Sequence, residues 1–247
     1  MKNLLFTAVI AIAFVPGAFA LTASDNSGNY SGTFIGLNQG TGFSAWTGSA
    51  TGGGGNYIGA SGLSSSSWAI YAGGAAGNSY QATRPFSTAM SIGDIFTVQL
   101  GYTATVTSGG EIGINLFSGG SFRLGFKFIG GQTNWQLNDG GSNFATGLTF
   151  AGGNPGATIN FGFTRNAGNG YGLNITQGAE SYIDSNMTSA SGSMSIDSVQ
   201  FYSSAQGGSQ NVGFNNLSVV PEPSTYALLA LTAAGFGAHV LRRRRRE

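Results

Sequence analysis

The sequence predicts an all-β protein whose central part folds as an antiparallel β-sandwich of the jelly-roll type. Apolar and polar residues alternate over many short stretches between Leu21 and Val219, which is the period of half-buried strands. Glycine and serine separate these stretches, and no stretch of this region repeats its apolar residues at helical spacing. We therefore expect short strands joined by Gly-rich turns, without intervening helices.

The first 20 residues have the organisation of a secretion signal. Lys2 supplies positive charge, an apolar run extends from Leu4 to Val15, and Ala18 and Ala20 occupy the two small-residue positions read by signal peptidase. A buried N-terminal strand or helix is the alternative, but such an element does not require a charge, an apolar run and small residues in this order. We expect a signal helix that is removed after Ala20, so that the mature chain begins with Leu21.

The composition of the exported region, residues 21–219, limits its functions. Hydrophobic residues make up 41% of the chain and charged residues only 8%, which favours a packed core over disorder. Between Leu21 and Val219 there are four basic and seven acidic side chains, a net charge of −3. We exclude nucleic-acid binding, because it requires clustered Lys or Arg. Cysteine is absent, so disulfides and thiolate metal sites are excluded as well.

Individual strands can be placed from the alternation. The expected strands are 96–102, 112–116, 121–128, 134–137, 158–164, 171–175, 194–202 and 212–219. In the clearest one, Phe122, Leu124, Phe126 and Phe128 share one face, and Ser118-Gly119-Gly120 joins it to the preceding strand as a hairpin turn. The alternation is interrupted at three places. The apolar parity shifts across Asn215-Asn216, which predicts a β-bulge, and the runs at 52–55 and 64–67 are expected to be loops.

The C-terminal region, residues 220–247, combines three features in a fixed order. Pro221, Glu222 and Pro223 precede an apolar stretch over residues 225–241. Five arginines follow this stretch: Arg242, Arg243, Arg244, Arg245 and Arg246. A helix over 225–241 would be about 26 Å long, close to the ~30 Å of a bilayer core. The arginines resist entry into hydrocarbon, so we expect a single transmembrane helix with a cytoplasmic stop-transfer cluster.

This order resembles the PEP-CTERM tail of exosortase substrates in Gram-negative bacteria, over about 27 residues. The resemblance implies that an exosortase-like sorting enzyme recognises the tail in the inner membrane and cuts close to the motif. The exported domain would then reach the cell surface, the extracellular polysaccharide or the biofilm matrix. An ordinary single-pass anchor is the alternative. The strand ahead of the motif also resembles the closing strand of lectin-like, carbohydrate-binding sandwiches.

The exported region lacks the residues on which many enzymes depend. The only histidine, His239, lies in the apolar stretch of the tail, which leaves no base for a serine nucleophile and no zinc ligand set. Paired carboxylates remain as a catalytic route, with Glu111 and either Glu180 or Asp184 as candidates for glycan cleavage. Because acidic side chains are few and are usually solvated, we expect no catalytic residues and no enzyme.

Trp135 is the sequence's best candidate for stacking on a sugar ring. Asn134 precedes it and Asp139 lies in the following turn, so that polar groups able to bind hydroxyls surround it. Core packing is nevertheless the interpretation that we favour for each of the three tryptophans. A structural Ca²⁺ could use Asp139 with loop oxygens, and no other cofactor is expected. The sequence thus predicts a non-enzymatic exported protein that binds polysaccharide, with a glycan-cleaving enzyme or a purely structural matrix protein as alternatives.

Overall fold

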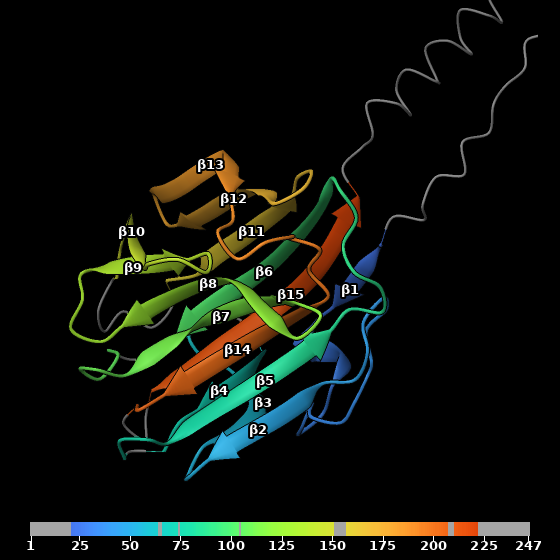
Figure 1. Ribbon diagram of the computed structural model, residues 1–247. Helices are drawn as coiled ribbons and strands as arrows, with labels where there is room; N and C mark the ends of the chain where they lie inside the picture. The colour runs from blue at the N-terminus through green and yellow to red at the C-terminus, as the bar shows by residue number, and fades with distance from the viewer. Residues whose placement is uncertain are drawn as a thin grey trace, which may run out of the picture.

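The computed structural model describes residues 21–63, 66–73, 75–103, 105–150, 157–206 and 210–221. Two antiparallel sheets pack face to face in this region, as the sequence predicts (Figure 1). The predicted signal helix and transmembrane helix lie outside the described residues. Within the described ranges the helical structure is a single 3-10 turn, η1 (Ser27–Asn29), and no helix is long and apolar enough to cross a membrane.

Eight strands form the first sheet, called sheet A. In spatial order they are β13 (Glu180–Thr188), β12 (Gly170–Gln177), β11 (Ile159–Arg165), β6 (Asp94–Tyr102), β15 (Asn211–Pro221), β4 (Ser67–Tyr71) and β3 (Gly55–Gly59), with β1 (Ala23–Asp25) beside β15. The second sheet, called sheet B, has seven strands. Their order is β10 (Phe144–Thr149), β9 (Asn134–Asn138), β8 (Ser121–Ile129), β7 (Glu111–Ser118), β14 (Ser198–Ser204), β5 (Ser79–Pro85) and β2 (Thr47–Thr51).

The predicted hairpin and bulge are both confirmed. Ser118 pairs with Ser121, which leaves Gly119 and Gly120 as a two-residue turn with φ of 58° and 75°. Positive φ at both positions explains why two glycines stand there. In β15 the register shifts between Asn215 and Ser218, at the predicted parity change.

A second bulge corrects the reading of β8. Leu116 pairs with Leu124, whereas the next residue of β7, Phe117, pairs with Phe122, so Arg123 is an extra residue. An extra residue reverses the alternation, and Phe122 therefore leaves the face that it was expected to share with Leu124. The ring of Phe122 instead covers Gly125 on the outer face of sheet B.

Several strands have no counterpart in the prediction. Most of them lie in the N-terminal half, where β2 is exposed along its whole length and β4 is buried at four consecutive positions. The edge strand β13 is almost entirely exposed. None of these three patterns alternates, so a period of two could not reveal β2, β4 and β13, whereas β5 and β10 alternate in burial and were missed all the same. The predicted strand at 194–202 begins only at Ser198, although Met194 and Ile196 before it are buried.

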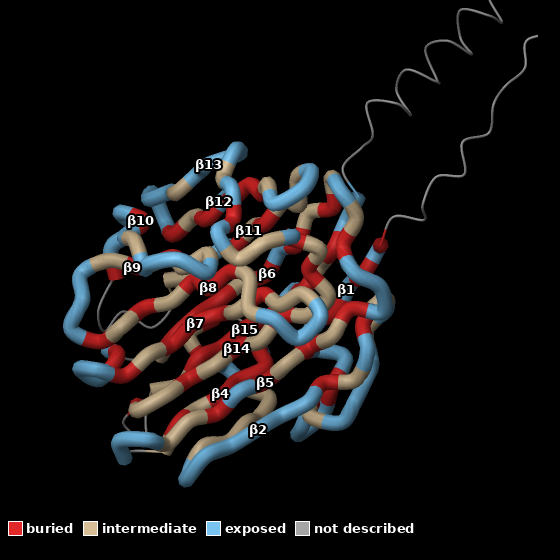
Figure 2. Tube along the Cα trace, viewed as in Figure 1, coloured by how far each residue is buried: buried red, intermediate tan, exposed pale blue. Residues whose placement is uncertain are grey.

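Aromatic side chains dominate the core between the sheets. Phe201 of sheet B stacks on Phe214 of sheet A with ring centroids 3.9 Å apart, and Trp46 and Trp68 pack beside Phe214. Figure 2 shows the buried residues running along the central strands, while β2 and β13 at the rims are exposed. Burial of these large rings is the main stabilising contribution to a chain without disulfides.

Candidate functional site

A groove on the outer face of sheet B, called the sheet B groove, combines aromatic and polar side chains. It has a volume of about 410 Å³ and crosses strands β5, β14, β7, β8 and β9. The side chains that matter here are Gln81, Asn115, Phe122, Lys127, Asn138 and Tyr202. They come from five strands, so the groove exists only when the sheet is assembled.

Two buried glycines lie in the rows of residues that cross the sheet B groove. Gly113 lies between Tyr202 and Lys127 in one row across the strands. Gly125 lies between Asn115 and Asn138 in the next row. Neither glycine is open to a ligand, because the Phe122 ring covers Gly125 and Lys127 packs against Gly113.

Hydrogen bonds hold the polar side chains of the groove in place. The Nδ2 of Asn115 donates to Oε1 of Gln200 at 3.2 Å, and the Nε2 of Gln200 donates to Oε1 of Gln81 at 3.2 Å. Lys127 Nζ lies 3.2 Å from Glu111 Oε1, and both side chains remain partly exposed. The charges of this pair cancel, so the groove presents amides, hydroxyls and aromatic surface and no net charge.

Tyr202 keeps its proton at physiological pH. Burial raises the pKa of its phenol well above the usual range, and the nearby charge of Glu111 raises it further. The neutral hydroxyl can both donate and accept a hydrogen bond. Beside it, Phe122 offers apolar ring surface. This combination suits a ligand that has both hydroxyl groups and C–H faces.

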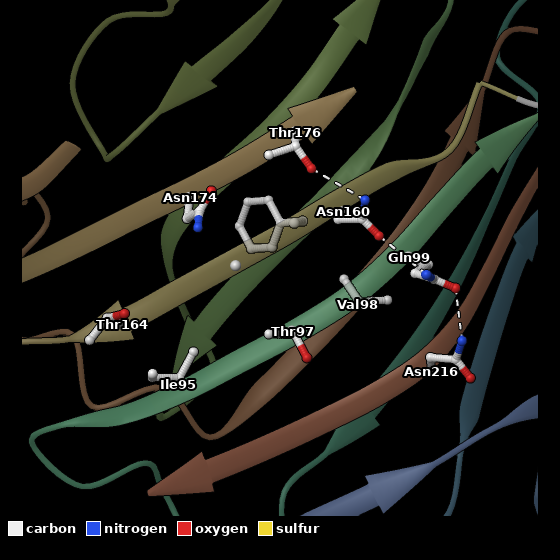
Figure 3. A pocket seen from close by; sticks show the side chains of 11 residues that line it. Ile95, Thr97, Val98, Gln99, Asn160, Thr164, Asn174, Thr176 and Asn216 are labelled. Carbon is white, nitrogen blue, oxygen red and sulfur yellow. Dashed lines mark hydrogen bonds between the residues drawn. The ribbon is translucent and has the colours of Figure 1, made fainter. Parts of the chain in front are cut away.

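A second groove, the sheet A groove, lies on the outer face of the other sheet (Figure 3). It has a volume of about 440 Å³ and crosses β15, β6, β11 and β12. A chain of amide hydrogen bonds spans it: Asn216 donates to Gln99 at 2.7 Å, and Gln99 donates to Asn160 at 3.2 Å. Asn160 in turn donates to Thr176 at 3.2 Å. Among the described residues no tyrosine or tryptophan lines this groove, so the sheet B groove, which Tyr202 lines, is the better candidate.

The prediction that Trp135 binds sugar was wrong. Its side chain is 2% exposed and its ring stacks on Phe126 with centroids 4.8 Å apart, so both ring faces serve the core. Asn134 and Asp139 do not line either groove. The neighbouring Asn138 does, because it lies opposite Gly125 on the outer face.

Sequence reasoning missed Tyr202 and Phe122. A usable signal existed for Tyr202: it follows the buried Phe201 in an alternating strand, which places an aromatic ring on the polar face. For Phe122 no sequence signal was available, because its side depends on the bulge at Arg123.

The candidate carboxylates lie on different sheets. Glu111 lies on sheet B beside Lys127, whereas Glu180 and Asp184 lie on β13 at the edge of sheet A. Glu180 and Asp184 are four residues apart on one strand, about 13 Å at ~3.3 Å per residue. This spacing exceeds the roughly 5–9.5 Å between the two carboxyl groups of glycosidases.

Asp139 accepts hydrogen bonds from other residues of the same chain. Its carboxylate accepts a hydrogen bond from the Tyr171 hydroxyl at 3.3 Å, and its carbonyl accepts one from the Ser191 amide at 3.1 Å. In the described part of the chain, no three His, Cys, Asp or Glu side chains gather as metal ligands. Calcium binding at Asp139 therefore stays a prediction.

Residues 219–246 match the family model of the PEP-CTERM protein-sorting motif. The chain thus carries the sorting signal that the sequence predicts, and this signal implies export. The match begins inside β15, where Pro221 pairs with Asp94 of β6. Glu222, Pro223 and the arginine cluster lie outside the described residues.

Comparison with curated proteins gives no match. A structure described as "Prominent members of the human gut microbiota express endo-acting O-glycanases to initiate mucin breakdown" is similar, with a TM-score of 0.52 and 10% identity over 80% of this chain and 98% of that chain. The cellulose induced protein Cip1 has a TM-score of 0.50 and 14% identity over 71% of this chain and 90% of that chain. An endo-β-1,4-glucuronan lyase from the fungus Trichoderma reesei has a TM-score of 0.49 and 11% identity over 78% and 95%, respectively. At these identities the likeness shows the two-sheet fold alone.

Proposed function

We propose that this chain is an exported cell-surface or extracellular-matrix protein that is sorted through its PEP-CTERM signal and binds polysaccharide in the sheet B groove. Signal peptidase would release the mature N-terminus, and an exosortase-like enzyme would process the tail at the inner membrane. The domain would then act outside the cell without catalysing a reaction.

The observation that carries the binding proposal is that the rings of Tyr202 and Phe122 line one groove together with the amide side chains of Gln81, Asn115 and Asn138. Sugar rings present apolar C–H faces, which pack on aromatic rings, and hydroxyl groups, which bind amides. The amide row through Asn115 is already oriented by hydrogen bonds, so little side-chain freedom is lost on binding.

The charge of the groove narrows the ligand class. Glu111 and Lys127 neutralise each other, and the remaining lining groups are uncharged. We therefore expect a neutral, hydroxyl-rich polysaccharide, with weak dependence of affinity on salt.

Binding can be tested with the processed protein in mild detergent against a panel of neutral and acidic polysaccharides. Tyr202→Ala and Phe122→Ala should each weaken binding by about tenfold or more, as expected for central aromatic contacts. Asn174→Ala in the sheet A groove is the matched control and should leave binding unchanged. Equal affinities of all variants would exclude the sheet B groove as the site.

The same preparation separates the alternative functions. Appearance of reducing ends that disappears in Glu111→Gln or Glu180→Gln would establish the glycan-cleaving enzyme instead. Absence of binding on the whole panel, together with self-association on sizing columns, would favour a purely structural matrix protein.

Sorting is tested independently by mass spectrometry of protein from the native host. A C-terminus near Pro223 that is lost in Glu222→Ala is expected, and an intact tail in both chains would indicate a plain anchor.

A further inference from the structure

Asp94 is a buried carboxylate with one unsatisfied oxygen. It begins β6, is 1% exposed, and its Oδ2 accepts a hydrogen bond from the Ser91 amide at 2.7 Å. Its Oδ1 is buried and has no hydrogen-bond partner. Such a group is costly in a folded protein, so a missing partner for Oδ1 requires an explanation.

Leu21, the predicted first residue of the mature chain, lies at this carboxylate. The pairing of Ala23 with Val219 and of Asp94 with Pro221 brings the start of β1, the end of β15 and the start of β6 to one end of sheet A. The Leu21 side chain is buried there, and its backbone N–H is near enough to the Asp94 carboxyl group to lower the pKa of Asp94, although it makes no hydrogen bond to Oδ1.

We propose that signal-peptide cleavage creates the missing partner: the new α-ammonium group of Leu21 forms a buried ion pair with Asp94. Water adds across the Ala20–Leu21 peptide bond, and at neutral pH the Ala20 carboxyl group loses a proton while the Leu21 amine takes one up. In the uncut chain this nitrogen is a neutral amide with one N–H. After cleavage it carries a positive charge and three donors, one of which can be directed at Oδ1.

One other charged group acts on Asp94 in the described structure. Arg165 of the neighbouring β11 lowers the pKa of Asp94, but burial outweighs this effect and the pKa of Asp94 is raised overall. The Nη1 of Arg165 donates its hydrogen bond to the Met90 carbonyl. The carboxylate is therefore incompletely compensated before cleavage, and a second cation in contact with it would be stabilising.

The ion pair would link the two processing events of the chain. Asp94 pairs through its backbone with Pro221, the first residue of the sorting tripeptide. Stabilising Asp94 after signal cleavage therefore anchors the strand end from which the sorting tail leaves the domain. The strand end that carries the motif would therefore be more stable in a chain that has lost its signal peptide than in an uncut chain.

The test compares three chains in mild detergent. The first is residues 21–247 with a free Leu21 amine, the second is the same chain with that amine acetylated, and the third is extended by Ala20 at the N-terminus. The extension keeps the charge but moves the ammonium by one residue. We expect acetylation and extension each to lower Tm by about 5 °C, and to have no such effect in the Asp94→Asn background. Equal Tm values for the three forms in the wild-type background would overturn the proposal.

A second measurement does not depend on the folding of Asp94→Asn. The pKa of the Leu21 α-amino group, followed by NMR or by the pH dependence of its acylation, should exceed the usual value of about 8 in the free-terminus form. In the Ala20-extended form the α-amino pKa should be ordinary. An ordinary pKa in both forms, with equally fast acylation, would show that the terminus lies in solvent and would refute the ion pair.

Discussion

Replacing Asp25 with asparagine should expose how much the N-terminal segment depends on one buried ion pair. Arg84 Nη2 lies 2.7 Å from Asp25 Oδ2, and both side chains are fully buried. The guanidinium also donates to Asn38 Oδ1 at 2.8 Å and lies 5.1 Å from the centre of the Trp46 ring. Burial lowers the pKa of Arg84, which reflects the same cost of keeping its charge away from water.

The magnitude follows from what remains after the substitution. Asp25→Asn removes the negative charge and leaves the Arg84 cation buried, a change that costs about 3–5 kcal/mol in known cases. For a domain of this size each kcal/mol lowers Tm by about 2–4 °C, so a fall of about 6–20 °C is expected. The Tyr30 hydroxyl, which donates to Asp25 Oδ2 at 2.6 Å, would lose its charged acceptor as well.

The assay is urea unfolding followed by tryptophan fluorescence, which all three buried tryptophans make sensitive to loss of the core. Lys127→Gln is the matched control, because it breaks a partly exposed ion pair and should cost less than about 1 kcal/mol. The double variant Asp25→Leu/Arg84→Met should be more stable than Asp25→Asn, since no charge is left buried. If Asp25→Asn unfolds at the same urea concentration as Lys127→Gln, the reasoning is refuted.

Three further predictions concern the core, a close backbone contact and pH. Trp135→Ala should cost about 3–5 kcal/mol in urea unfolding while the remaining folded protein binds polysaccharide normally; weakened binding would return Trp135 to the site. Gly130→Ala should destabilise by about 1–3 kcal/mol, because its Cβ would lie 1.8 Å from the Thr107 carbonyl oxygen, and an unchanged unfolding midpoint would contradict this. In a chain that retains Ala20, the raised pKa of Asp94 means that its contribution to stability is present below about pH 4 and is lost as pH rises through the folded-state pKa. The Tm difference from Asp94→Asn, measured from pH 3 to 7, should show this loss, and a difference that does not vary with pH would disprove it.

The strands that could be predicted are those with one face in the core and one in solvent. Among them, β6, β7, β8, β11 and β12 were found with every end within two residues of its position in the structure. The strands β2 and β13 carry almost no buried residues, because they lie at sheet edges. Their positions follow from pairing with β5 and β12, which is information that a local pattern does not contain.

The candidate groove does not contain the residues that the sequence singles out for sugar binding. The sequence indicates an all-β exported domain with aromatic and amide groups suited to a glycan, and it singles out Trp135 among the aromatic residues. Trp135 alternates with Leu137, and both are buried. Alternation identifies residues that share a face, but it does not tell which face is turned to the core.

The sequence by itself determined the sorting signal, the antiparallel sandwich, the Gly119-Gly120 turn and the absence of His and Cys side chains from residues 21–219, while the secretion signal stays a prediction. These features depend on the local order of residues and on the amino-acid composition, and both are contained in the sequence. Only the tertiary structure decided that Tyr202 and Phe122 line one groove, because that groove requires the register of five strands and a bulge at Arg123. It also brought Leu21 to Asp94, since two residues 73 positions apart meet only when β15 lies between their strands.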